Sequence, residues 1–171
     1  TQYMLGESLL VAPIFNPQGT AEYYVPDGTW LDFFTGMPVQ GGRSYLNQYD
    51  YFSLPLLVRP NTLLAVGKEI RQVVYDYAQD VTLHLVGLED GGTAVCTVYA
   101  ADGTADLTAK ATRSGGAVTI QTQGNKPFTL LLRNVAKVAS VTGAAFVSTR
   151  EGLLLTPQEM TGTVTVQMEK E

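Results

Sequence analysis

Few side chains of this 171-residue sequence could do chemistry. It has one histidine and one cysteine, whereas a zinc site needs three or four His, Cys or carboxylate ligands. His84 alternates with Leu83 and Leu85, which favours a strand residue on the surface over a general base. No Gly-x-Ser-x-Gly segment supports a Ser-His-Asp triad. We therefore expect no catalytic, cofactor-binding or metal-binding residue in this chain.

Carboxylates and aromatic rings gather in the N-terminal third of the sequence. Two carboxylates could hydrolyse a glycoside, but near Gly and Pro such residues usually form turns. Exposed rings could stack on sugars, so a carbohydrate-binding module is an alternative function. Adjacent strand residues point to opposite faces, however, so several rings must pack inward. The carboxylates are Glu22, Asp27, Asp32 and Asp50, and the rings are Tyr23, Tyr24, Trp30, Phe33, Phe34, Tyr45, Tyr49, Tyr51 and Phe52.

Composition excludes several classes of protein. A hydrophobic content of 45% is enough for a globular core, and a net charge of -5 argues against a nucleic-acid partner. No apolar run approaches the roughly 18 residues that span a bilayer, so no membrane partner is expected. Cys96 cannot form an internal disulfide, which indicates a reducing compartment and a cytoplasmic location.

Short β-strands and turns dominate the pattern. The apolar run 9–15 is too short for a helix, and the runs 22–25 and 30–34 flank a Pro-Asp-Gly turn, which predicts a hairpin. Residues 52–59 and 63–66 read as two further strands. Beyond residue 80, period-2 alternation predicts seven to nine strands of a β-sandwich. No helix with convincing caps is expected.

Two lobes follow from these elements. The first lobe spans residues 1–67, the polar and irregular segment 68–80 is a connection, and the second lobe spans residues 81–171. We expect an all-β fold of two small antiparallel β-sandwiches. The run 9–15, with Leu54 and Leu56–Leu57, offers more apolar side chains than a lobe of this size encloses easily, which predicts an exposed apolar face.

Five segments of the first lobe together resemble glycoside hydrolase family 31. They are residues 2–6 (QYMLG), 9–13 (LLVAP), 24–30 (YVPDGTW), 54–59 (LPLLVR) and 61–64 (NTLL). In that family these motifs follow the catalytic (β/α)8 barrel and build the proximal C-terminal β-domain. The resemblance implies that the second lobe is the distal C-terminal β-domain, and that the barrel covers the apolar face of the first.

Segments of the second lobe resemble the bacterial α-xylosidase branch of the family. They are residues 94–96 (AVC), 100–103 (AADG), 110–113 (KATR) and 132–135 (LRNV). The resemblance implies a parent enzyme that releases terminal α-xylosyl units from oligosaccharides with retention of configuration. An α-glucosidase parent is the nearest alternative.

Family resemblance also bears on the site residues and partners. The family carries its aspartate nucleophile and aspartate acid/base on the barrel, and its Asp-Met-Asn-Glu segment occurs nowhere in this sequence. The resemblance thus implies an accessory chain without catalytic residues, inactive when isolated. The partners expected are the (β/α)8 barrel and other copies of the same chain.

Overall fold

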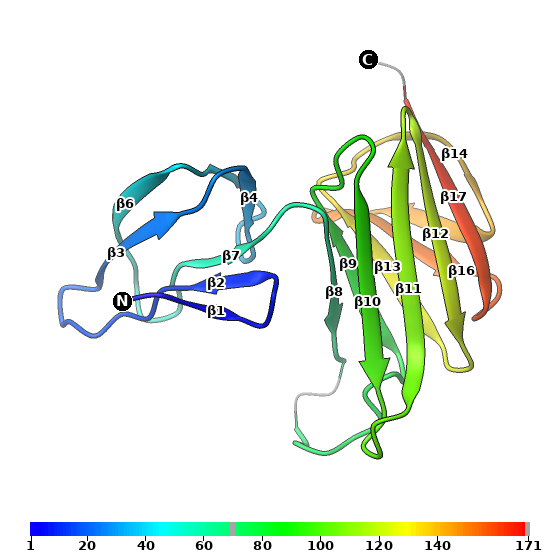
Figure 1. Ribbon diagram of the computed structural model, residues 1–171, viewed down its shortest axis with the longest axis horizontal. Coiled ribbons are helices and arrows are strands. Elements are labelled where there is room, and N and C mark those ends of the chain that lie inside the picture. The colour runs from blue at the N-terminus through cyan, green and yellow to red at the C-terminus, as the bar shows by residue number, and fades with distance from the viewer. Residues whose placement is uncertain (69–70, 170–171) are drawn as a thin grey trace. The chain divides into compact units, whose positions relative to one another are not determined.

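The computed structural model describes residues 1–68 and 71–169, and every regular element within them is a β-strand (Figure 1). The all-β class expected from the sequence is confirmed. The chain divides into two compact units, Thr1–Pro60 and Asn61–Glu171.

A five-stranded sheet and a two-stranded sheet form the first unit. The larger sheet has the order β1-β2-β7-β4-β5, the smaller one pairs β3 with β6, and all pairs are antiparallel. A small core that includes Tyr23 and Trp30 lies within this unit. The strands are β1 Tyr3–Leu5, β2 Leu9–Val11, β3 Thr20–Val25, β4 Thr29–Asp32, β5 Pro38–Gln40, β6 Arg43–Gln48 and β7 Leu56–Val58.

The hairpin predicted around residues 26–28 is wrong. β3 pairs with β6, and β4 pairs with β5 and β7, so the Pro-Asp-Gly segment carries the chain from one sheet to the other. Gly28 there has a φ of 110°, a conformation that side-chain-bearing residues rarely adopt. The indole N–H of Trp30 donates to the Pro26 carbonyl at 3.0 Å and fixes this corner. Local turn residues predicted the bend correctly but could not identify the pairing partner.

Two five-stranded sheets form the second unit, with orders β10-β11-β12-β17-β14 and β15-β16-β13-β9-β8 (Figure 1). Their facing side chains build one large core. Among the described residues, all pairs are antiparallel except β9 with β13, which run parallel. The strands are β8 Thr62–Val66, β9 Val81–Val86, β10 Thr93–Tyr99, β11 Ala105–Ser114, β12 Ala117–Gly124, β13 Phe128–Arg133, β14 Val138–Thr142, β15 Ala144–Ser148, β16 Gly152–Pro157 and β17 Gly162–Met168.

The unit boundary differs from the one expected near Gly67. Strand β8 pairs with β9, and Leu63 is buried in the core of the second unit, so the units divide after Pro60. A change in composition along the sequence can indicate a turn. The position of a domain boundary depends instead on the core in which the next strand is packed. Within the connection predicted at 68–80, residues 69–70 lie outside the described residues.

The described part of that connection packs on the second unit. Ala78 is buried in the second core, and the Lys126 ammonium lies 2.9 Å from the Asp76 carboxylate. Lys126 also pairs with Asp106 of β11 at 2.5 Å. These two hydrogen-bonded ion pairs raise the pKa of Lys126. The segment from residue 71 to 80 is thus part of the second unit.

Candidate docking surface on the first unit

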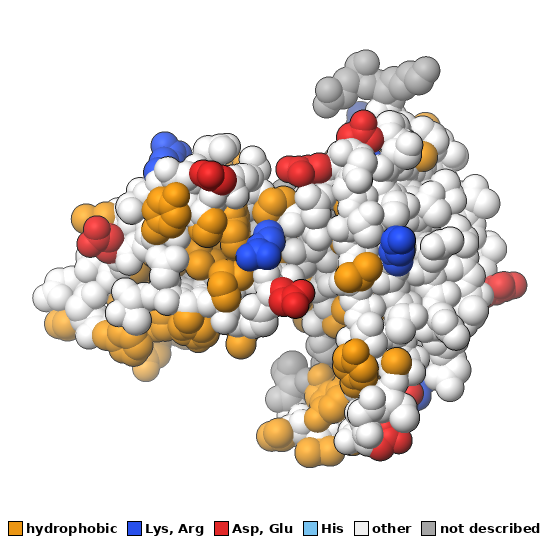
Figure 2. Space-filling view, in the orientation of Figure 1, with side chains coloured by type: hydrophobic (Ala, Val, Ile, Leu, Met, Phe, Trp, Pro, Cys, Tyr) orange, Lys and Arg blue, Asp and Glu red, His pale blue; other side chains and the backbone are white. Residues whose placement is uncertain are grey.

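Large apolar side chains are exposed on one surface of the first unit. Tyr51 and Phe52 are 97% and 89% exposed, and their rings meet edge to face with centroids 5.9 Å apart. Figure 2 shows hydrophobic side chains gathered along the lower edge of this unit. We define the docking surface by seven residues, which are Tyr3, Pro13, Ile14, Phe15, Tyr51, Phe52 and Leu54.

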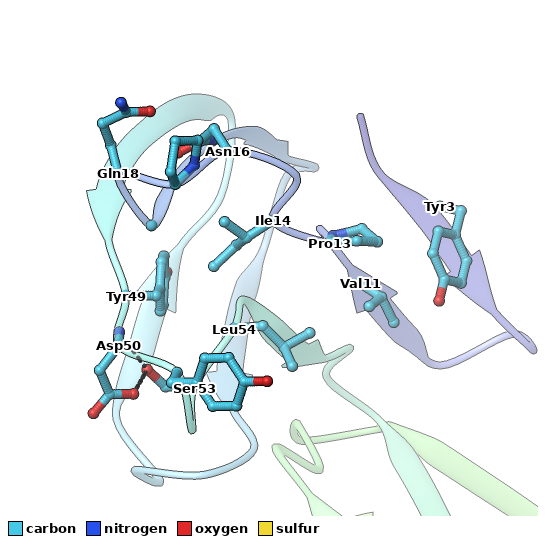
Figure 3. Close-up of a pocket in the computed structure, with 13 residues that line it drawn as sticks. Tyr3, Val11, Pro13, Ile14, Asn16, Gln18, Tyr49, Asp50, Ser53 and Leu54 are labelled. Carbon is cyan, nitrogen blue, oxygen red and sulfur yellow. Dashed lines mark hydrogen bonds between the residues drawn. The ribbon is translucent and has the colours of Figure 1, made fainter.

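A hollow of about 720 Å³ lies within the docking surface (Figure 3). Its walls come from β1, β2 and the two segments 13–19 and 49–54, which lie side by side although they are distant in sequence. The size is in the range of small-ligand pockets, which are mostly apolar with a few polar groups that orient the ligand. The apolar walls are supplied by Val11, Pro13, Ile14 and Leu54, and the polar groups by Asn16, Gln18, Tyr49, Asp50 and Ser53.

The polar side chains of the hollow shape its own loops. The Asp50 carboxylate accepts hydrogen bonds from the Ser53 hydroxyl at 2.5 Å and the Phe52 amide at 3.0 Å. These bonds, that from Ser53 first, lower the pKa of Asp50 and so keep it charged. The Asn16 side chain donates to the Thr20 carbonyl at 2.6 Å and accepts from the Thr20 amide at 3.0 Å.

The Tyr49 side chain is also hydrogen-bonded within the first unit. Its hydroxyl lies 2.9 Å from that of Tyr23, to which the Asn47 amide also donates at 3.2 Å. Burial, followed by the hydrogen bond to Tyr49, raises the pKa of Tyr23, so its hydroxyl stays neutral. Because the Asn16, Tyr49, Asp50 and Ser53 side chains are hydrogen-bonded within the unit, the wall of the hollow is mainly apolar. Such a wall suits an apolar protein surface better than a hydroxyl-rich sugar.

The aromatic residues singled out in the sequence divide into two sets. Trp30, which is 2% exposed, and Tyr23 are buried, while Tyr45 and Tyr49 pack against that core. The exposed members are Tyr24, Phe34, Tyr51 and Phe52. Alternation predicted that some rings would be buried, but it carries no signal that distinguishes Tyr51 and Phe52, because they lie outside any strand.

Of the residues expected on the apolar face, Pro13, Ile14, Phe15 and Leu54 belong to the docking surface, whereas others are buried. Leu10, Ala12 and Leu57 are buried in the small core of the first unit. Phe15 of the same run is exposed, as are Tyr51 and Phe52, which the sequence did not single out for this face. Leu10 and Leu57 are buried because they lie on the paired strands β2 and β7, whereas these exposed rings lie on loops.

Two of the candidate carboxylates form turns. The Asp32 carboxylate accepts from the Thr35 amide at 2.8 Å and the Thr35 hydroxyl at 2.9 Å. Asp50 does the same with Phe52 and Ser53. Asp27 and Glu22 are exposed, at the corner after β3 and on β3 itself. The turn hydrogen bonds account for Asp32 and Asp50 without a catalytic role.

His84 and Cys96 lie on strands of the second unit. His84 is buried, not on the surface as expected, and its Nδ1 is 3.4 Å from Arg133 Nη1. Burial, and then the Arg133 charge, lower the pKa of His84. Burial raises the pKa of the half-buried Cys96 thiol, which opposes formation of the nucleophilic thiolate. Alternation identified the faces of these strands but not how fully each face is covered.

Residues 1–68 and 71–169 contain neither a cluster of metal ligands nor a helix suited to crossing a membrane. Within them, no three side chains of His, Cys, Asp or Glu are grouped so that they could hold a metal ion. The same residues contain no helix with the length and apolar character needed to cross a membrane.

Two family profiles match the chain, in an order that follows its two units. The family described as "Glycosyl hydrolase family 31 C-terminal domain" matches residues 1–64. The family described as "Alpha-xylosidase YicI, C-terminal domain" matches residues 76–168, which is more than half of the chain.

Known relatives are much longer proteins. Alpha-xylosidase XylQ of Lactiplantibacillus pentosus is 38% identical over 129 residues, which cover 72% of this chain and 16% of XylQ. Alpha-glucosidase 2 of Bacillus thermoamyloliquefaciens is 29% identical over 103 residues, covering 60% of this chain and 13% of the relative. The chain thus spans about a sixth or less of the length of these relatives.

Solved structures share the fold. The GH31 dextranase FjDex31A of Flavobacterium johnsoniae, complexed with glucose, matches 97% of this chain and 26% of its own, with a TM-score of 0.77 at 17% identity. The GH31 alpha-xylosidase Xac1773 of Xanthomonas citri matches 77% of this chain and 16% of its own, with a TM-score of 0.55 at 23% identity.

Proposed function

The chain belongs to glycoside hydrolase family 31, and from this membership we propose that it is the non-catalytic C-terminal region of a retaining enzyme of that family. The enzyme would be an α-xylosidase that releases terminal α-xylosyl units from oligosaccharides. The match to the YicI C-terminal family and the similarity to XylQ support this substrate class. The similarity to an alpha-glucosidase makes α-glucosides the alternative substrate.

The docking surface of the first unit would pack against the catalytic (β/α)8 barrel of the same enzyme. The observation that carries this role is the pair of nearly fully exposed rings, Tyr51 and Phe52, beside a hollow in which most polar side chains are hydrogen-bonded within the unit. Exposed apolar patches of this kind usually mark an interface, and aromatic side chains are frequent anchors in interfaces.

Burial of the two exposed rings would supply a substantial favourable term for docking. Burying two aromatic side chains removes roughly 300–500 Å² from water, which corresponds to about 8–12 kcal/mol before the entropic cost of association. The Asp50 turn holds the segment that carries these rings, which lowers the entropic cost of ordering it.

The role of the second unit follows from its position in the proposed enzyme. It would be the distal β-domain, with the first unit as the proximal one, and the residues from 71 to 80 packed on the distal sandwich. Cys96 is consistent with a cytoplasmic enzyme of carbohydrate metabolism, because its half-buried thiol needs no oxidising compartment.

Binding to the separately produced barrel would test the proposed role. We expect the chain to bind the barrel in calorimetry, and Phe52→Ser to weaken binding at least about tenfold, since it removes one buried ring. The matched control is Phe34→Ser, which changes an exposed ring outside the docking surface and should leave the affinity unchanged. The same chain should hydrolyse no α-xyloside and no α-glucoside.

Two results would contradict the proposal. Absence of binding to the barrel, or equal binding by Phe52→Ser and the unaltered chain, would show that the docking surface has another role. Micromolar binding of xylo- or gluco-oligosaccharides that is lost in Phe52→Ser would favour the carbohydrate-binding alternative.

A further inference from the structure

The second unit has four edge strands, and three of them carry a feature that discourages pairing with another chain. Strands β8 and β10, at the edges of the two sheets, lie against each other and close one flank of the sandwich. Strand β14 has a register irregularity between Val138 and Ser140. Such bulges and covered edges are the usual protection of a sheet against edge-to-edge association.

Strand β15, Ala144–Ser148, has no register irregularity and no strand paired along its outer edge within the described residues, although the Ser148 hydroxyl at its end donates to the Ala136 carbonyl at 3.3 Å. Its sequence, Ala-Ala-Phe-Val-Ser, contains no charge and no proline, and its register with β16 is regular. Phe146 and Val147 lie on opposite faces of the strand and are 53% and 55% exposed. An uncharged, regular and partly apolar edge is the kind that pairs with another strand.

Hydrogen bonds of the β15–β16 hairpin show which backbone groups face the open edge. Thr149 and Gly152 exchange both backbone bonds, Thr149 N–H to Gly152 O at 2.8 Å and the reverse at 3.4 Å. Because bonded and non-bonded pairs alternate, Val147 bonds to β16, whereas the N–H and carbonyl of Phe146 point away from it. No described residue beyond the hairpin donates a backbone bond to Phe146 or accepts one from it.

We propose that β15 pairs with β15 of a second copy of this chain, antiparallel, about a two-fold axis through Phe146. In that register the Phe146 N–H donates to the carbonyl of the partner's Phe146, and the reciprocal bond forms by symmetry. Val147 then lies opposite the partner's Ala145, so apolar side chains meet on both faces of the joined sheet. Two five-stranded sheets become one sheet of ten strands.

The sequence and backbone of β15 favour a second copy of this chain as the partner at its open edge. Its five residues are uncharged, so antiparallel pairing with itself opposes no like charges. The backbone N–H and carbonyl of the central residue, Phe146, point away from β16. The two-fold axis can therefore pass through a hydrogen-bonded pair formed by Phe146 of each copy. A two-fold contact uses the same edge on both copies and closes the assembly as a dimer.

A charge exchange at Phe146 tests the two-fold arrangement. Phe146→Lys alone and Phe146→Glu alone each place two like charges opposite each other across the axis, so each should raise the dimer dissociation constant at least about tenfold in sedimentation. A mixture of the two variants places opposite charges there and should restore dimers. Val95→Lys, at an exposed position of β10, is the matched control and should leave the dimer intact.

Hydrogen exchange of the unaltered chain gives a second measurement that needs no folded variant. The Phe146 amide should become protected as the protein concentration rises, while the Val147 amide, bonded to β16 in either state, should not change. A chain that stays monomeric at high concentration, a mixture that fails to restore dimers, or a Phe146 amide that exchanges equally fast at all concentrations would overturn the proposal. None of these results bears on docking through the first unit, because β15 belongs to the second.

Discussion

The two units reach stability in different ways. The buried cluster of the second unit unites side chains from both of its five-stranded sheets, including Leu83, Ile120, Leu130 and Leu155. The corresponding cluster of the first unit is much smaller and centres on Trp30. At the same time the first unit exposes Phe15, Tyr51 and Phe52, the most exposed phenylalanine and tyrosine rings among the described residues.

Size explains part of this difference. A domain of about 60 residues buries only roughly 60% of the surface of its unfolded chain, so it has little apolar area for its own core. The first unit also leaves several of its largest apolar groups on its surface. Such a unit is marginal by itself and gains stability when a partner covers those groups. From the larger core of the second unit we expect it to fold independently.

The largest effect is expected when the two units are separated. Residues 61–171 produced alone should unfold cooperatively on heating, because their core is complete. Residues 1–60 produced alone should be largely unfolded at room temperature, because the small core cannot offset the loss of chain entropy. Circular dichroism and amide exchange would measure both. A cooperative melting transition in the shorter fragment would show that the first unit is self-sufficient.

Trp30→Ala should be the most damaging single change in the first unit. It removes the largest buried side chain and the hydrogen bond to Pro26, and should destabilise the first unit by about 3 kcal/mol or more. Tyr51→Ala, at a fully exposed ring, is the control and should leave the isolated chain nearly unchanged. Amide exchange resolved by residue would show faster exchange in the strands of the first unit, β1 to β7, and unchanged exchange in the second unit. Equal loss of protection in β12 and β13 would mean that the two units unfold together.

The sequence predicted local structure better than it predicted pairing. The strand expected at 63–66 is confirmed, because it lies within β8, Thr62–Val66. The pairing of β3 with β6 was missed, since it joins residues separated by a long segment and no local pattern encodes it. Strand β15 was missed because Ala, Ala and Ser give no alternating signal.

The docking surface could be predicted only in outline. An excess of apolar residues in a small lobe indicated that some must remain exposed, and the structure shows that some do. Which ones depends on strand pairing, which buried Leu10 and Leu57 and left Tyr51 and Phe52 on a loop. The site therefore becomes specific only when the three-dimensional arrangement is known.

Asp50→Ala should loosen the loop that carries the exposed rings of the docking surface. The change removes the acceptor for the Ser53 hydroxyl and the Phe52 amide, so the loop that carries both exposed rings should lose its fixed conformation. We expect faster amide exchange in residues 51–53, weaker binding to the barrel than that of the unaltered chain, and no change in the second unit. Asp32→Ala, which opens a similar turn outside the docking surface, is the control. Equal binding by both variants would show that the Asp50 turn does not support docking.

The smallest expected effect is a pH dependence that belongs to the second unit alone. Burial and the Arg133 charge hold the pKa of His84 below its usual 6.5 in the folded chain, and the charge of Glu151 offsets this only in part. At a pH well above 6.5 the imidazole is neutral in both folded and unfolded chains and contributes nothing to the pH dependence. As the pH falls toward and below 6.5, the unfolded chain takes up a proton that the folded chain does not, so the second unit loses stability.

His84→Gln removes this titration while every carboxylate stays in place. Urea unfolding of residues 61–171 between about pH 7.5 and about pH 5.5 should therefore give a steeper loss of stability for the unaltered unit than for His84→Gln. Equal slopes would mean that the imidazole binds its proton as readily in the folded unit as in the unfolded chain. Burial beside Arg133 would then not raise the free energy of protonating His84.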